Sequence, residues 1–193
     1  MPLKIVFVGP ESSGKTTLCL KLAERFNTRW VPEACRLAAE QRDALNPNEI
    51  VQFAFTTADF IAMAKLQNAM ELDQQQRCEK LLLCDNDTFA LSVWCERYLG
   101  QHQDTIYSMY AEASELNNPA KVYILTKPNV PFVQDGYRDG EHIREWMYEK
   151  FIEELNKRGM LYHIIDSPDY NERFEKAVQI IESCMKSVSK NEN

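Results

Sequence analysis

A short apolar segment that runs directly into a glycine-containing loop most constrains the fold of this chain. Residues 3–8 are mostly β-branched, aromatic or leucine, and Gly9 ends the run. A run of this length bounded by glycine is typical of a strand buried on both faces of a parallel sheet. The next eight residues read GPESSGKT, and the apolar Leu18, Leu20, Leu22 and Ala23 follow them. We therefore predict a strand, a loop and a helix from about Gly14 to Phe26, with these four residues packing inward.

The loop matches the Walker A pattern Gly-x-x-x-x-Gly-Lys-Ser/Thr in the strand-to-helix context that its mechanism requires, which disfavours a chance match. Its glycines let backbone N–H groups turn toward phosphates, and the helix presents its positive N-terminus to the same anion. Lys15 is expected to reach the β- and γ-phosphates of ATP, Thr16 to supply a Mg²⁺ ligand and Thr17 to contact the α-phosphate. The expected ATP contacts in this segment are Gly9, Glu11, Ser12, Ser13, Gly14, Lys15, Thr16 and Thr17.

The rest of the chain alternates segments with strand and helix patterns. Further strands are predicted at 29–31, 81–84, 121–125 and 161–165. Further helices are predicted from a cap at 46–49 towards 76, and at 89–99, 104–116, 143–158 and 168–188. This alternation predicts an α/β fold whose five-stranded, mostly parallel sheet carries helices on both faces. We expect one domain, residues 1–186, and a disordered tail, residues 187–193.

Composition excludes several classes of protein. The 29 acidic residues exceed the 22 basic ones, which gives a net charge of -7 and disfavours nucleic-acid binding, since that requires a basic face. The six cysteines are scattered without metal-ligand spacing, as buried thiols of a reducing compartment would be. No apolar stretch approaches membrane-spanning length. We therefore expect a cytoplasmic protein that acts on small molecules; a homo-oligomer is left open.

Two carboxylates follow the strand predicted at 81–84. Mg²⁺ prefers hard oxygen ligands, and Asp85 stands where nucleotide-binding enzymes supply one. We expect Asp85 to bind metal with Thr16, and Asp87 to orient or deprotonate a substrate hydroxyl. The pattern does not settle which aspartate has which role, and Asp87 could instead be the N-cap of the helix that begins at Thr88.

Four further residues are candidates for the acceptor side. Glu33 follows the short strand at 29–31, and Arg36 lies one helical turn later. Ligands of doubly wound sheets bind at the carboxyl ends of the strands, so both residues could contact the phosphate acceptor. The alternative is that Glu33 and Arg36 form a solvent-exposed ion pair. Arg138 lies between two glycines in a loop at about 128–142 and is a candidate lid arginine, or a solvated loop cation. Trp94 could stack on a planar base or belong to the core.

The segments CDNDT at 84–88, PFVQDGYR at 131–138 and DYNERF at 169–174, together with the loop at 9–17, resemble the ribosylnicotinamide kinase domain at the C-terminus of NadR-type proteins. The likeness extends from Ile5 to about Ile181. It implies a three-layer α/β/α P-loop NTPase fold of the nucleoside-monophosphate-kinase type. It also implies an enzyme of NAD salvage that transfers the γ-phosphoryl group of ATP to the 5′-hydroxyl of nicotinamide riboside, giving nicotinamide mononucleotide.

The resemblance also assigns roles to matching residues. It places the ATP phosphates on Gly14, Lys15, Thr16 and Thr17, the carboxylates Asp85 and Asp87 near Mg²⁺ and the ribose hydroxyl, Arg138 in the lid, and Tyr170 and Arg173 near adenine. Larger NadR proteins carry an adenylyltransferase domain with a His-x-Gly-His motif; this sequence lacks the motif, so the activity is expected to stop at the kinase step.

Two alternatives stay open. One is a kinase for another nucleoside or nucleotide, because Asn86 stands where the family usually has a small residue. The other is an ATPase that acts as a regulatory switch with a protein partner. A GTPase switch is disfavoured because residues 126–129, TKPN, lack the Asn-Lys-x-Asp guanine motif.

Overall fold

The apolar run near the N-terminus forms the central strand of a five-stranded sheet in the computed structural model, which describes residues 1–45, 55–100, 103–117 and 121–191. The strands are β1 (Leu3–Val8), β2 (Arg29–Val31), β3 (Leu81–Asp85), β4 (Lys121–Thr126) and β5 (Tyr162–Ile165). Their order is β2-β3-β1-β4-β5, and all four pairings are parallel. Every residue of β1 is buried, as expected for a strand with helices on both sides. The predicted α/β class is confirmed.

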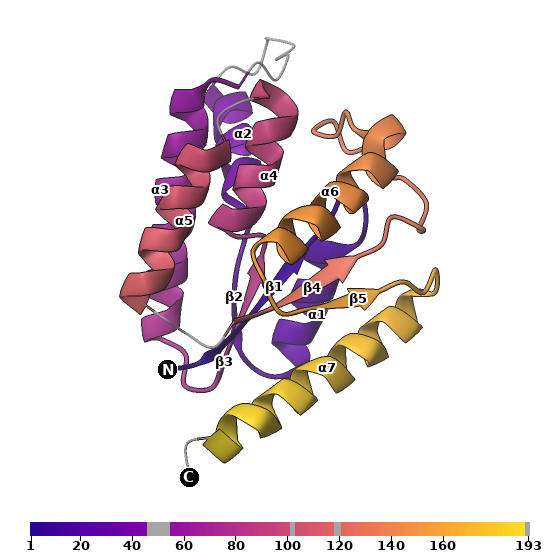
Figure 1. Cartoon of the computed structure of the whole chain (residues 1–193). Coiled ribbons are helices and arrows are strands. Elements are labelled where there is room, and N and C mark those ends of the chain that lie inside the picture. The colour runs from indigo at the N-terminus through magenta and orange to yellow at the C-terminus, as the bar shows by residue number, and fades with distance from the viewer. Residues whose placement is uncertain (46–54, 101–102, 118–120, 192–193) are drawn as a thin grey trace.

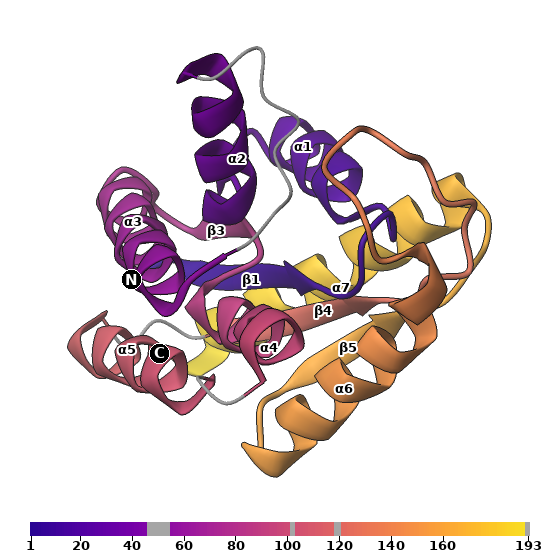
Figure 2. The same cartoon turned by 90° about the horizontal axis from the view of Figure 1, so that it is seen from above.

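Helices cover both faces of the sheet (Figures 1 and 2). One face packs against α1 (Lys15–Arg25) and α7 (Tyr170–Asn191). The other packs against α2 (Ala34–Leu45), α3 (Thr57–Gln76), α4 (Thr88–Leu99), α5 (Gln103–Asn117) and α6 (Arg144–Lys157), with the short 3₁₀ helix η1 (Glu141–Ile143) before α6. The three layers of the predicted fold are therefore present.

Two predicted helix boundaries differ from the structure. The tail expected to be disordered from Ser187 is helical through Asn191, and residues 192–193 lie outside the described part. Cys184, Met185 and Val188 extend the face of α7 that packs on the core, and no glycine or proline stops helix propagation. At the other boundary, α3 begins after a capping box formed by Thr56 and Asp59, and the predicted cap at 46–49 lies outside the described residues.

The carboxyl ends of the parallel strands lie at one edge of the sheet, where Gly9, Glu33 and Asp85 follow or end β1, β2 and β3. Gly9 has a φ of 139°, and a Cβ there would lie 2.7 Å from the carbonyl oxygen of Thr126, at the end of β4. Only glycine permits so close an approach, so the loop after β1 stays next to β4. No helix in the described ranges is both long and apolar enough to cross a membrane.

Candidate active site

A pocket at this edge of the sheet brings together most of the predicted site residues. Its lining includes residues 11–17 of the loop, Glu33 and Arg36 behind β2, Trp94 of α4, and Arg138 from the segment between β4 and α6. Three further aromatic residues, Phe55, Tyr98 and Tyr137, also line it. The pocket therefore combines a loop and helix start suited to phosphates with aromatic side chains suited to a planar group.

Lys15 is the cation at the centre of the loop. Its side chain is almost fully buried, and its ammonium group donates hydrogen bonds to the carbonyl oxygens of Gly9 (3.0 Å) and Pro10 (2.9 Å). Burial lowers the pKa of Lys15, whereas the carboxylates of Glu33, Asp85 and Glu11 oppose that shift. Gly14, with a φ of 86°, precedes α1 without a side-chain cap, so the helix N-terminus is open to an anion.

Two arginines support this loop from outside the pocket. Arg173 is 1% exposed and donates to the carbonyl oxygens of Ser13 (2.7 Å), Lys127 (2.7 Å) and Ser167 (2.5 Å). Arg144 donates to the carbonyl oxygen of Ser12 at 3.1 Å. Because the Arg173 guanidinium is engaged by carbonyls of three separate segments, the structure does not place it as a free contact for adenine. Tyr170, predicted beside it, lies against the ammonium group of Lys21 (4.7 Å from the ring centre) and is not part of the pocket lining.

Thr16 and Asp85 form the oxygen pair that fits Mg²⁺. The Thr16 hydroxyl donates to Oδ2 of Asp85 at 2.5 Å, while Oδ1 of this 2%-exposed carboxylate is buried without a hydrogen-bond partner among the described residues. Burial raises the pKa of Asp85, against the effects of Lys15 and the Thr16 hydrogen bond. Mg²⁺ is usually held by one or two carboxylates together with substrate phosphates, so this pair suffices on the protein side. The described ranges contain no cluster of three or more His, Cys, Asp or Glu suited to a metal.

Glu33 is a carboxylate in the pocket lining, where Glu11 is the other acidic residue. The side-chain amide of Asn86 donates to its Oε1 at 2.8 Å. Burial, followed by the neighbouring Asp85 carboxylate, raises the pKa of Glu33 to about 7, although Lys15, Arg36 and the Asn86 hydrogen bond act in the opposite direction. A carboxylate with a pKa near neutrality is suited to proton transfer at physiological pH.

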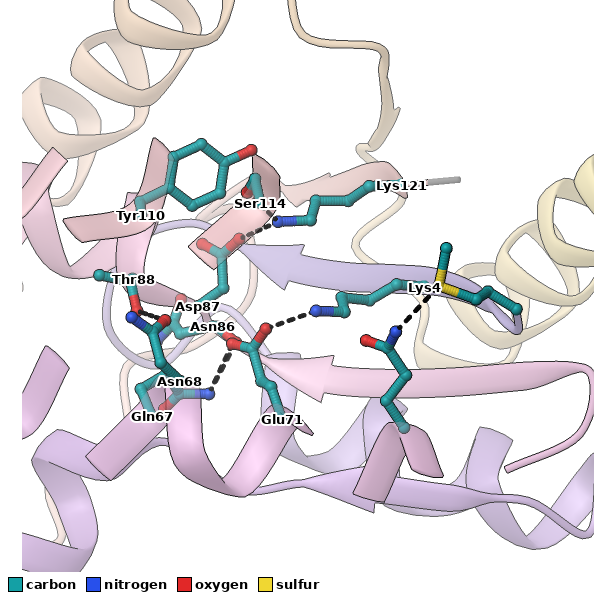
Figure 3. Close-up of polar contacts among 12 residues, drawn as sticks. Lys4, Gln67, Asn68, Glu71, Asn86, Asp87, Thr88, Tyr110, Ser114 and Lys121 are labelled. Carbon is teal, nitrogen blue, oxygen red and sulfur yellow. Dashed lines mark hydrogen bonds and ion pairs between the residues drawn. The ribbon is translucent and has the colours of Figure 1, made fainter. Parts of the chain in front are cut away.

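Asp87 is not brought to the pocket. It is 1% exposed and caps α4 by accepting from the backbone N–H of Ala90 (3.0 Å). It also accepts from the Tyr123 hydroxyl (2.8 Å) and pairs with Lys121 (3.4 Å), as Figure 3 shows for Lys121. Asn86, with a φ of 65°, turns the chain between the two aspartates, so Asp85 stays at the loop while Asp87 faces the core. Asp87 is therefore the N-cap of α4, which was the alternative to the predicted contact with substrate.

The segment between β4 and α6 lies against the loop and arches toward α1 (Figure 2). The backbone N–H of Val133 donates to the Ser12 hydroxyl (2.8 Å), and that of Gly140 donates to Oε2 of Glu11 (2.9 Å). Arg138 also reaches the Ser12 hydroxyl at 3.4 Å. Glu11 and Ser12, predicted to bind ATP, line the pocket and hold this segment with their side chains. The lid role predicted for residues 128–142 stays a prediction.

A comparison with protein families matches residues 4–173 to the family described as AAA domain. The chain belongs to this AAA-domain family. The NadR protein of Salmonella typhimurium, described as a trifunctional NAD biosynthesis/regulator protein, is 25% identical over 189 residues. Its Escherichia coli counterpart is 27% identical over 184 residues. Both alignments cover 94% of this chain but 42% of the relative, so the AAA domain described here spans less than half of their length.

Solved structures match the fold of this AAA domain. A NadR crystal structure in complex with NAD and AMP-PNP, and another in complex with NR, each superpose with a TM-score of 0.72 at 18% identity, over 94% of this chain and 49% of theirs. A thymidylate kinase from Ehrlichia chaffeensis superposes with a TM-score of 0.65 at 14% identity, over 94% of this chain and 99% of its own. The fold is thus that of P-loop NTPases, and the resemblance to NadR inferred from the motifs is confirmed.

The sequence pattern did not predict that Arg97 would lie next to the pocket. Its guanidinium pairs with Glu11 (3.0 Å) and with Asp139 (2.6 Å), and lies 5.5 Å from the ring centre of Trp94. Trp94 itself is 7% exposed and packs edge-on against Phe151, so it is a core residue with an edge in the pocket. Arg97 carries no motif signal, because its role depends on contacts with residues far apart in the sequence.

Asp87→Asn is expected to weaken folding of the AAA domain without altering ATP affinity. Asparagine remains a good N-cap, but it loses the charge that pairs with Lys121, so the free energy of unfolding should fall by about 1–3 kcal/mol. Urea unfolding and the KM for ATP measure the two effects. The matched control is Asp104→Asn, at an exposed position in the first turn of α5. If Asp87→Asn lost turnover while its stability was unchanged, Asp87 would instead belong to the active site.

Proposed function

We propose that this chain is an ATP-dependent kinase that phosphorylates the 5′-hydroxyl of nicotinamide riboside to give nicotinamide mononucleotide. The observation that carries this proposal is the convergence of Lys15, Thr16 and Glu33 on one pocket that aromatic side chains also line, with Asp85 hydrogen-bonded to Thr16. The likeness to NadR, including a solved NadR complex with NR, supports the choice of acceptor.

The loop side of the pocket is assigned to ATP. Backbone N–H groups at the start of α1 bind the phosphates, Lys15 contacts the β- and γ-phosphates, and Thr17 the α-phosphate. Thr16 and Asp85 hold Mg²⁺, which neutralises charge on the triphosphate when bound. Arg138, which contacts the Ser12 hydroxyl, is assigned to stabilise the charge that spreads over the transferred group.

Glu33 is assigned to the acceptor hydroxyl. As the new bond forms between the 5′-oxygen and the γ-phosphorus, the bond from that phosphorus to the bridging oxygen of ADP breaks, and the hydroxyl proton passes to the Glu33 carboxylate. Its pKa of about 7 places a substantial fraction of the carboxylate in the basic form at neutral pH. Trp94 and Tyr98 are assigned to the part of the pocket that receives the planar nicotinamide ring, and Arg36 to the ribose.

A thermal-shift experiment tests the acceptor without requiring turnover. Nicotinamide riboside, added to protein with Mg²⁺ and a nonhydrolysable ATP analogue, is expected to raise the melting temperature above that with the analogue alone, because it binds only the folded state. A larger rise with another nucleoside would redirect the acceptor assignment. No rise with any nucleoside would favour a regulatory ATPase instead.

A further inference from the structure

We propose that Gln67 of α3 is the positioning residue for Glu33. This inference rests on the proposed function, which assigns Glu33 to the acceptor hydroxyl. Gln67 is 2% exposed and lies outside the pocket lining, so it would act through its neighbours and not by touching substrate.

The side-chain amide of Gln67 contacts both the backbone next to Glu33 and the residue that donates a hydrogen bond to Glu33. Oε1 of Gln67 accepts from the backbone N–H of Ala34 at 2.9 Å, directly after Glu33. Nε2 of Gln67 lies 3.4 Å from the carbonyl oxygen of Asn86, whose side chain donates to Glu33 at 2.8 Å. The end of β2 and the turn after β3 are thereby joined through a third element, α3. Displacing this amide would move the Glu33 backbone and its hydrogen-bond donor together.

The orientation of the Gln67 amide is itself fixed by a buried ion pair (Figure 3). Nε2 donates to Oε1 of Glu71 at 3.1 Å, and Oε2 of Glu71 accepts from the ammonium group of Lys4 at 2.7 Å. An ionised carboxylate only accepts hydrogen bonds, so it selects the NH₂ end of the amide and leaves Oε1 for Ala34. Lys4 belongs to β1, so the chain of contacts runs from the centre of the sheet to Glu33.

Glutamine is the side chain of this length that satisfies all three partners, because it accepts from an N–H and donates to a carboxylate and a carbonyl oxygen. Methionine has a similar length and makes none of these hydrogen bonds. Glutamate would keep the bond from Ala34 but would bring a carboxylate against Glu71 and the Asn86 carbonyl oxygen.

The experiment compares Gln67→Met with Gln75→Met. Gln75 is a buried glutamine of the same helix, eight positions later; its Nε2 contacts Met1 and its Oε1 has no hydrogen-bond partner within the described ranges. We expect Gln67→Met to lower kcat with nicotinamide riboside roughly tenfold to a hundredfold with the KM for ATP unchanged, since small displacements of a catalytic group have effects of this size. Gln75→Met should change neither constant. Gln67→Glu is the second variant, with the same expected loss of kcat, should Gln67→Met fold poorly.

A spectroscopic arm separates this inference from the proposed function. In the ¹H–¹⁵N spectrum of substrate-free protein, the side-chain amide signal of Asn86 is expected to shift in Gln67→Met and not in Gln75→Met. If the unsubstituted protein does not phosphorylate nicotinamide riboside while this shift is seen, the proposed function fails and the link from Gln67 to Asn86 and Glu33 stands. An unshifted Asn86 signal together with an unchanged kcat would overturn the positioning role.

Discussion

Lys15→Ala is expected to lower the rate of ATP-dependent phosphoryl transfer by roughly 10²–10³-fold, the effect of removing one preorganised donor from a developing anion. The ammonium group of Lys15 is held inside the loop by the carbonyl oxygens of Gly9 and Pro10, so it is already positioned where the phosphates are proposed to bind. Alanine also removes the positive charge from between Glu33, Asp85 and Glu11, which makes the pocket less favourable for a polyanion.

The measurement is ADP release under saturating acceptor, together with ATP binding. Lys21→Ala is the matched control, because Lys21 is an exposed lysine of the same helix whose ammonium group lies 4.7 Å from the ring centre of Tyr170, outside the pocket lining. Transfer should be retained in the control. A Lys15→Ala protein that is folded and as active as the unsubstituted chain would contradict the assignment of the loop to ATP.

Glu33→Gln is expected to lower transfer by roughly 10²–10⁴-fold, the usual contribution of a general base, while ATP binding is retained. The substitution keeps the size of the side chain and an oxygen for the Asn86 amide, so the pocket should keep its shape. In the unsubstituted chain, kcat/KM should decline as pH falls below about 7, where the Glu33 carboxylate becomes protonated. The residual activity of Glu33→Gln should not show this decline of kcat/KM at low pH. If the variant still shows it, a group other than Glu33 causes the decline.

The same substitution is expected to stabilise the fold at alkaline pH. The pKa of Glu33 is raised from 4.5 to about 7, so the folded state binds this proton more tightly than the unfolded state and loses stability as pH rises between those values. Glutamine removes that penalty, and the gain in unfolding free energy at pH 8 should be at most about 3 kcal/mol. Below pH 4.5 the gain should vanish. Urea unfolding at both pH values measures it, with the exposed Glu24→Gln of α1 as control.

The geometry of the loop after β1 could be predicted from the sequence because it depends on local structure. A buried strand, glycines and a helix N-terminus follow one another along the chain, so Lys15 and Thr16 are placed by neighbouring residues. Asp85 ends the strand directly beside β1, and its contact with Thr16 follows from that pairing.

Other features depend on conformations and contacts that the sequence pattern does not encode. Residues 85 and 87 appear equivalent as a pair of strand-end aspartates until the left-handed conformation of Asn86 turns Asp87 into the core. Arg173 reaches Ser13 across 160 positions, so its support of the loop could not be inferred from its place in a helix. Leu20, predicted to pack inward, is 44% exposed because it falls on the outer side of α1 between Leu18 and Leu22.

Formation of nicotinamide mononucleotide tests the central claim most directly. The protein is incubated with ATP, Mg²⁺ and nicotinamide riboside, and both products are quantified by mass spectrometry, with Lys15→Ala as the reference. We predict that nicotinamide mononucleotide and ADP appear in equal amounts and that both form at least about a hundredfold more slowly with the variant. ADP without nicotinamide mononucleotide, or phosphorylation of a different nucleoside in its place, would contradict the proposed function.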